Sequence, residues 1–270
     1  FFFKQKTAYE IPKRDWSSDV CSSDLAFVGK GGSGKSTIAA LFARILAQQG
    51  EKVIALDSDP MPGLSYALGL EVDDTPIPGD LVVEGPKPGP EWVLKPNIEP
   101  LSLVEKYSLK TAEGVHYFQF GNTRGAWGAI SKGQHVWSEV VKQLPESSWS
   151  LVGDLPGGLR QPMNGWGKYA EIALIVTEPT TKGVITARQL AKLTNAKWGP
   201  RAIGVVVNKV QAQDNPDDIA GRINLPLVGV VPENSVIQQA EVELRSPFGL
   251  PGTEKVESAI RTLIETVRQI

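Results

Sequence analysis

Short apolar runs alternate along this chain with longer stretches whose apolar residues recur at helical spacing. The apolar runs, of a kind that a parallel sheet buries on both faces, occupy residues 25–28, 52–56, 115–120, 149–153, 172–177, 202–207 and 227–231, with a weaker candidate strand at 98–104. Helical spacing marks residues 37–47, part of 61–69, and the stretches 136–144, 183–193, 234–242 and 254–268. This alternation predicts an α/β fold, a doubly wound and mostly parallel sheet with helices on both faces.

Two stretches depart from the alternating pattern. Residues 71–100 are rich in proline and glycine, and because the alternation resumes after them we interpret them as a long surface excursion rather than a domain boundary. Residues 121–133 are polar and glycine-rich, which predicts a loop. Three tryptophans in loop-like surroundings are expected either to cover the body of the protein or to face a partner: Trp92, Trp127 and Trp166.

The first predicted strand leads directly into a phosphate-binding motif. Residues 29–37 read G-K-G-G-S-G-K-S-T and match the pattern G-x-x-x-x-G-K-[ST], in which backbone N–H groups surround phosphates at a helix N-terminus. We expect Lys35 to bridge the β- and γ-phosphates, Ser36 to ligate Mg²⁺ and Thr37 to reach the α-phosphate. The whole loop is therefore a candidate nucleotide site: Gly29, Lys30, Gly31, Gly32, Ser33, Gly34, Lys35, Ser36 and Thr37.

Acidic residues end two other predicted strands. Asp57 and Asp59 straddle the end of the strand at 52–56, and Asp154 ends the strand at 149–153 just before Gly157 and Gly158. Ligands of doubly wound sheets bind beyond the carboxyl ends of the strands, and Mg²⁺ takes one or two carboxylates beside phosphates. We expect Asp154 to hold a metal-bound water. The simpler alternatives are an Asx-turn at Asp57 and a Pro-Gly turn after Asp154.

Composition limits the classes of function. The chain has 28 Lys and Arg against 30 Asp and Glu, a formal net charge of −2, so charge alone does not indicate nucleic-acid binding. No apolar run reaches the roughly 18 residues of a membrane helix, and we expect a soluble cytoplasmic protein. The two histidines, His116 and His135, have no spacing typical of metal ligands, which favours structural roles.

The first 24 residues are set apart from the rest of the chain. They resemble the conceptual translation of a sequencing-library adapter, and we expect them to be foreign to the natural protein. They hold the single cysteine, Cys21, so the remainder offers no thiolate for a disulfide, a metal site or a nucleophile. Residues 25–270 are then expected to form a single P-loop domain around the phosphate-binding motif.

The phosphate loop contains a second lysine, Lys30, which an ordinary loop of this kind does not require. With it, K-G-G-S-G-K-S-T resembles the deviant Walker A box of the MinD, ParA, ArsA, CooC and nitrogenase-iron-protein group of ATPases. This resemblance implies a homodimer that forms with ATP and Mg²⁺, in which Lys30 reaches the other subunit's ATP. D-S-D-P at residues 57–60 resembles the group's switch I, which implies that Asp57 assists at the metal and that Asp59 orients or activates the attacking water. D-L-P-G-G from Asp154 resembles its switch II.

The same resemblance extends to the base side of the site. Asn208 and Lys209 after an apolar strand look like the motif whose asparagine reads a purine, and Pro232 and Glu233 match the segment that packs on the base. A guanine site would want an aspartate where Gln211 stands, so adenine is preferred. Asn208 is otherwise a strand-end turn residue.

Among these relatives the later part of the chain looks closest to CooC-like maturation ATPases. Residues 176–180, V-T-E-P-T, resemble their V-x-E-P-[ST] run, but the C-x-C motif that binds nickel there is absent and G-N-T-R-G at 121–125 stands at about that place. Three hypotheses stay open. They are a dimeric Mg-ATP switch that matures or loads a client protein, a ParA- or MinD-like positioning ATPase on DNA or a membrane, and a nucleotide-binding module that does not hydrolyse. The apolar stripe of the last predicted helix favours core packing over membrane binding.

Overall fold

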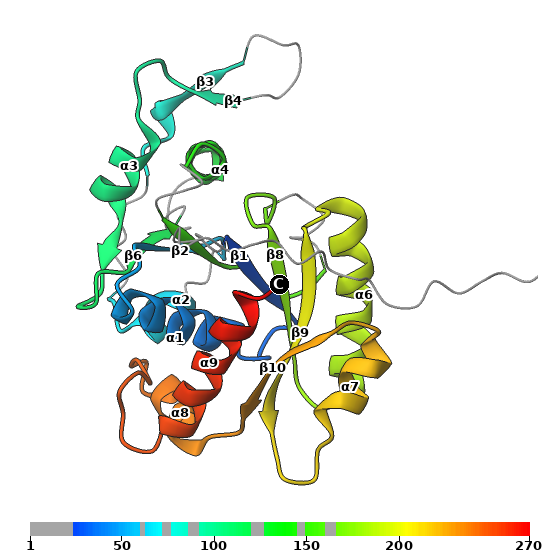
Figure 1. Ribbon diagram of the computed structural model, residues 1–270. Helices are drawn as coiled ribbons and strands as arrows, with labels where there is room; N and C mark the ends of the chain where they lie inside the picture. The colour runs from blue at the N-terminus through cyan, green and yellow to red at the C-terminus, as the bar shows by residue number, and fades with distance from the viewer. Residues whose placement is uncertain are drawn as a thin grey trace, which may run out of the picture.

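The computed structural model describes residues 24–59, 63–71, 77–85, 92–119, 127–144, 149–159 and 166–270. Eight strands form the central sheet: β1 (Leu25–Gly29), β2 (Val53–Asp57), β5 (Leu109–Lys110), β6 (His116–Gln119), β7 (Ser150–Asp154), β8 (Ile172–Thr177), β9 (Ala202–Val210) and β10 (Leu227–Pro232). Their spatial order is β10-β9-β8-β1-β7-β2-β6-β5 (Figure 1), and every neighbouring pair is parallel except β5 with β6. The predicted mostly parallel sheet is confirmed.

Helices cover both faces of this sheet, as the alternation predicts. One face packs on α1 (Lys35–Gln48), α2 (Gly63–Leu68) and α9 (Glu254–Val267), with α8 (Ser235–Val242) beside them. The other face packs on α3 (Pro100–Tyr107), α4 (Trp127–Lys142), α6 (Thr181–Lys197) and α7 (Pro216–Ile223). The apolar stripe of α9 is buried against the sheet, so it is core packing, and none of the described helices is both long and apolar enough to cross a membrane.

The strand predicted at residues 98–104 is wrong, because this stretch forms the helix α3. The Glu99 carboxylate caps the helix by accepting hydrogen bonds from the backbone N–H groups of Leu101, at 3.2 Å, and Ser102, at 2.6 Å. Pro100 occupies the first helical position, where its missing N–H costs nothing. These two local signals outweigh the strand-like run of apolar residues.

Other boundaries also differ from the prediction. Helix α4 begins at Trp127, so residues 127–133 of the predicted loop are helical, and β9 continues through Asn208 and Lys209 to Val210. The sequence did not predict α7, β5, a short 3₁₀ helix (Gly79–Leu81) or the antiparallel pair β3 (Val82–Glu84) and β4 (Trp92–Leu94). The pair β3–β4 lies at the top of Figure 1, within the predicted excursion. The adapter-like residues up to 23 and the G-N-T-R-G segment lie outside the described residues.

Two of the three loop tryptophans cover the body of the protein. Trp92 on β4 stacks on His135 of α4, with ring centroids 5.4 Å apart. Trp166 lies against the buried Trp137 of α4, also at 5.4 Å. Both contacts close the sheet face that carries α3 and α4.

The sheet order creates a crevice beside β1. The chain passes from β1 to β2 on one side, whereas β8 lies on the other side of β1. Where the connections from two adjacent strands run to opposite sides of the sheet, a crevice that can bind a ligand opens at the carboxyl ends of those strands. The loop after β1 stands at this point.

Candidate functional site

The loop between β1 and α1 forms a cradle of backbone groups. Gly32 and Gly34 adopt left-handed φ values of 80° and 88°. Gly34 is also the N-cap of α1, and among the described residues no side chain caps this helix and no acidic residue occupies its first turn. The unpaired N–H groups and the positive end of the helix dipole therefore face the crevice. Lys35 is 7% exposed and curls back over the loop, its Nζ 3.5 Å from the Lys30 carbonyl oxygen.

Ser36 and Asp154 meet at the first turn of α1. The Ser36 hydroxyl donates a hydrogen bond of 2.5 Å to Asp154 Oδ2, while Oδ1 of the same buried carboxylate has no partner within the described part of the chain. Burial raises the pKa of Asp154 to about 6, against the lowering effects of Lys35 and of the Ser36 hydrogen bond. A carboxylate with an unused oxygen beside a hydroxyl can hold a hydrated cation.

Asp57 stands next to Asp154, since the two residues are register partners on β2 and β7. Both oxygens of Asp57 already accept hydrogen bonds, Oδ1 from the Asp59 backbone N–H at 2.9 Å and Oδ2 from the Tyr117 hydroxyl at 3.0 Å. Burial and the charge of Asp154 raise the pKa of Asp57 well above its usual range. The geometry thus favours Asp154 over Asp57 as the carboxylate nearest a metal.

The ends of β8 and β9 hold the phosphate loop from outside. Asn208 is 7% exposed, and its Nδ2 donates to the Ser33 carbonyl at 2.8 Å. The Lys209 ammonium donates to the Gly32 carbonyl and to Glu178, both at 2.8 Å, from a backbone with a φ of 59°. A Cβ on Gly34 would lie 2.2 Å from Asn208 Nδ2, so this contact requires glycine. Asn208 is thus buried within β9 and holds the loop, so it is not the strand-end turn residue of the simpler alternative.

The segment after Asp154 packs directly on the same loop. The backbone N–H of Gly158 donates to the Gly29 carbonyl at 3.1 Å. A Cβ on Gly157 would lie 2.9 Å from both the Cα and the N of Gly31. The two glycine-containing segments can approach this closely because neither carries a side chain there.

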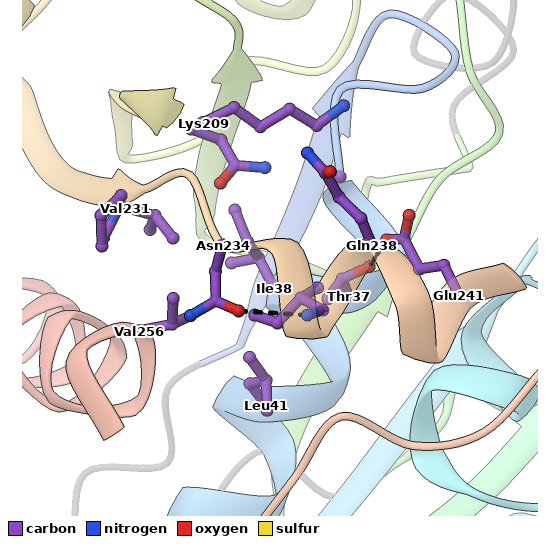
Figure 2. Close-up of a pocket in the computed structure, with 13 residues that line it drawn as sticks. Thr37, Ile38, Leu41, Lys209, Val231, Asn234, Gln238, Glu241 and Val256 are labelled. Carbon is purple, nitrogen blue, oxygen red and sulfur yellow. Dashed lines mark hydrogen bonds between the residues drawn. The ribbon is translucent and has the colours of Figure 1, made fainter. Parts of the chain in front are cut away.

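Two adjoining hollows flank α8. One is a cleft of about 270 Å³ whose lining includes Gly32, Lys35, Ser36, Tyr66 and Leu244. The other is smaller, about 30 Å³, and is lined by Ile38, Leu41, Asn208, Pro232 and Val256 among others (Figure 2). Glu241 and Thr37 line both hollows, and the Thr37 hydroxyl donates to Glu241 Oε1 at 2.6 Å. Figure 2 shows this contact between α1 and α8.

The predicted site residues differ in how close they lie to these hollows. The loop residues and Asp154 gather at the first turn of α1, whereas Lys30 is exposed. Pro232 lines the smaller hollow, while the Glu233 side chain lies beside it and accepts hydrogen bonds from Gln211 and Gln238. The Thr37 hydroxyl, predicted to reach a phosphate, is engaged by Glu241.

The sequence missed three residues of this region. Tyr117, Glu178 and Glu241 each bond a predicted site residue. Glu178 carries a signal, because it follows an apolar strand as the other site residues do. Tyr117 and Glu241 carry none that a local pattern reveals, since they lie 60 and 204 residues from their partners.

Both histidines make contacts typical of structural roles. His116 Nδ1 lies 3.2 Å from the Ser108 hydroxyl and its ring packs edge-on against Trp149. His135 stacks on Trp92. In the part of the chain that the structure describes, no three His, Cys, Asp or Glu side chains form a metal-binding cluster.

Comparison with known proteins identifies what this arrangement is similar to. Residues 25–248 match the model of the CobQ/CobB/MinD/ParA nucleotide-binding domain. An ATP-binding protein of Methanocaldococcus jannaschii is 30% identical over 84% of the chain and 91% of that protein. The carbon monoxide dehydrogenase accessory protein CooC of Rhodospirillum rubrum is 24% identical over 90% of the chain and 97% of that protein.

A solved structure resembles the fold. The septum site-determining protein MinD of Pyrococcus horikoshii, complexed with Mg-ADP, superposes with a TM-score of 0.66 at 24% identity. The match covers 91% of this chain and 95% of that one. At this identity the match supports the architecture rather than the chemistry.

Proposed function

The chain belongs to the CobQ/CobB/MinD/ParA family of nucleotide-binding domains, and from this premise we propose that it binds and hydrolyses Mg-ATP as a dimeric switch that acts on a client protein. The observation that carries the proposal is the pairing of Ser36 with Asp154 at the start of α1, where one carboxylate oxygen is buried and unused within the described residues. Relatives named as ATP-binding proteins support the choice of nucleotide.

The residues present fit both ATP and Mg²⁺. The N–H groups of the loop and the Lys35 ammonium would hold the phosphates. Ser36 and Asp154 would hold the cation, directly or through its water, and Asp57 would stabilise the switch beside them. Besides Asp154 Oδ1, the fully buried Ser33 hydroxyl has no partner among the described residues. Two buried polar atoms without partners, one in the loop and one beside it, favour a site built for a polar ligand.

The base would lie over the mouth of the smaller hollow between α1 and α8, because a hollow of about 30 Å³ is too small to enclose a purine. The apolar surface of Pro232 at this hollow suits one face of a purine. Gln211, in place of an aspartate, favours adenine over guanine. Glu241, at the junction of the two hollows, is an acceptor that suits the ribose hydroxyls once its bond to Thr37 opens.

Hydrolysis is assigned to the switch segment after β2. Asp59 would orient the attacking water by accepting its hydrogen bond, and Asp57 fixes the Asp59 backbone through the bond to its N–H. When bound, Mg²⁺ neutralises the charge that develops on the phosphate oxygens. Gly157 and Gly158 allow the switch II segment to remain close to the loop and to shift on phosphate release.

A client protein is preferred over DNA or a membrane as the partner. The net charge is −2, and the apolar stripe of α9 is buried, which removes the amphipathic surface that membrane binding requires. CooC is named as an accessory protein of another enzyme, in line with action on a client. Because the one cysteine is Cys21, we do not extend the proposal to thiolate-bound metal cargo. Sedimentation with DNA or with liposomes in the presence of ATP tests the positioning alternative.

The proposed hydrolysis is tested by Asp59→Ala. We expect the steady-state ATPase rate to fall by at least about 100-fold, because an oriented water contributes a factor of this order, whereas the affinity for a fluorescent ATP analogue stays within about twofold. Asp217→Ala, an exposed aspartate on α7, is the matched control and retains the wild-type rate.

Two results would contradict this assignment. Hydrolysis by Asp59→Ala at the wild-type rate would remove Asp59 from the chemistry. Tight ATP binding without any turnover in the wild-type protein would favour a nucleotide-binding module that does not hydrolyse.

A further inference from the structure

Tyr117 is a buried residue whose hydroxyl reaches the edge of the proposed site. It lies on β6 in register with Ala55 of β2, and register partners on parallel strands point to the same face of the sheet. That face also carries Asp57, two residues beyond Ala55. The ring is 1% exposed and belongs to the core beneath α1 and α2. From there the hydroxyl extends to Asp57.

The Tyr117 hydroxyl joins three elements. It donates to Asp57 Oδ2 of β2 at 3.0 Å, lies 3.0 Å from Gln119 Oε1 of β6, and shares a side-chain hydrogen bond with Ser65 of α2. A phenol has one proton to donate, so the hydroxyl serves Asp57 Oδ2 or Gln119 Oε1 at any one time, and the oxygen of Asp57 accepts whether or not that carboxyl is ionised. Burial and the charge of Asp57 raise the pKa of Tyr117, which keeps the hydroxyl protonated as a donor.

These contacts hold both sides of the proposed switch I segment. Asp57 is the first residue of the segment, and its other oxygen, Oδ1, accepts the hydrogen bond from the backbone N–H of Asp59. Ser65 follows the segment and is fully buried. The Tyr117 hydroxyl thus contacts both Asp57, which fixes the Asp59 backbone, and Ser65 of helix α2, which follows the segment. Tyr117 itself is not among the residues that line the two hollows flanking α8.

We propose that Tyr117 is a positioning residue that fixes Asp59 through its hydrogen bonds to Asp57 and Ser65. The assignment rests on the proposed ATPase function, because Asp59 acts on the attacking water there. Loss of the hydroxyl loosens the backbone of Asp59 without removing a nucleotide contact. The expected consequence is slower hydrolysis at unchanged nucleotide affinity.

The test is Tyr117→Phe in the full chain, which keeps the ring in the core and removes only the hydroxyl. In the protein without nucleotide, we expect the Asp59 amide to exchange its hydrogen about tenfold faster, while amides within β2 keep their wild-type rates. With ATP and Mg²⁺, we expect kcat to fall about tenfold and KM to stay within about twofold. A role in folding stability alone would lower the melting temperature but would leave both of these quantities unchanged.

Matched variants separate the possible outcomes. Tyr107→Phe on α3 removes a remote tyrosine hydroxyl and should match the wild type in exchange and in kcat. Ser65→Ala removes one of the two anchors, so the exchange rate at Asp59 should rise and kcat should fall, each by a smaller factor than in Tyr117→Phe. If Tyr117→Phe fails to fold, Ser65→Ala serves as the test in its place.

Failure of this inference is distinguishable from failure of the proposed function. Unchanged exchange at Asp59 in Tyr117→Phe overturns the positioning role whether or not the protein hydrolyses ATP. Faster exchange at Asp59 together with an unchanged kcat, in a wild-type protein that hydrolyses ATP, overturns the link between this backbone and hydrolysis. Faster exchange in a wild-type protein that does not hydrolyse ATP supports the positioning and refutes the proposed ATPase.

Discussion

Asp154 is a buried carboxyl whose ionised form is disfavoured in the protein without ligand. Burial raises its pKa to about 6, and the neighbouring Asp57 is shifted upward as well, whereas an aspartate in an unfolded chain has a pKa near about 3.9. Between about pH 4 and pH 6 the folded chain therefore retains a proton that the unfolded chain has released. The free energy of unfolding falls as the pH rises through this window, and it stays lowered above it.

Asp154→Asn should reverse this loss. The amide keeps an acceptor for the Ser36 hydroxyl but carries no charge, so we expect the unliganded variant to melt at a higher temperature than the wild type at about pH 7.5. Below about pH 4 the difference should vanish, since both groups are then neutral. Thermal unfolding across this pH range measures the effect, with Asp217→Asn as an exposed control. A difference that is the same at every pH would show that charge is not its cause.

The sequence predicts which residues lie together in the site better than it predicts the hydrogen bonds that each of them makes. Ser36 and Asp154 could be placed together because a helix start and a parallel strand end meet at one edge of a sheet. Asp57 was expected at the metal, yet both of its oxygens accept bonds from Asp59 and Tyr117. The Thr37–Glu241 contact joins residues 204 positions apart, which no local pattern encodes.

At the scale of elements, long buried strands were predictable and short or capped elements were not. β2 and β8 have continuous apolar runs and are buried along their whole length. Helix α3 shares a strand-like run, and its helical form is decided by Glu99 and Pro100. β5 has only two residues and exists through its pairing with β6. Its position depends on tertiary contact rather than on sequence periodicity.

The end of β9 offers a prediction about how an element serves the site. Asn208 donates to the Ser33 carbonyl, so its first role is to hold the phosphate loop rather than to read a base. We expect Asn208→Ala to weaken the binding of ATP and of inorganic tripolyphosphate by the same factor, about tenfold, as for loss of one buried hydrogen bond. Competition against a fluorescent nucleotide measures both affinities.

Exposed Asn195 on α6 provides the matched control, because Asn195→Ala leaves the loop untouched. A loss confined to ATP, with tripolyphosphate affinity unchanged, would instead assign Asn208 to the purine. The two outcomes separate a clamp on the loop from a contact to the base.

At the scale of the whole molecule, the parts that a common fold dictates were predictable and the excursion was not. The sheet, the loop and the switch segments follow from burial and from the geometry of strand ends. The pair β3–β4 and the helices α3 and α4 form a separate cluster on one face, with Trp137 at its centre. This cluster is built from contacts between segments that carry no recognisable motif, so its structure could not be predicted from the sequence.

The proposed dimer depends on Lys30. The residue lies in the phosphate loop but is exposed, whereas Lys35 is buried over the loop. A cation that points outward from an anion site can serve an anion on a second copy of the chain. We expect size-exclusion chromatography with light scattering to find a dimer for Asp59→Ala in ATP and Mg²⁺ and a monomer in ADP. Adding Lys30→Ala to this variant should abolish the dimer while leaving nucleotide affinity within about threefold, and adding Lys255→Ala on α9 should not. A monomer in both nucleotides, or a dimer that survives without Lys30, would remove the second subunit from the proposed site.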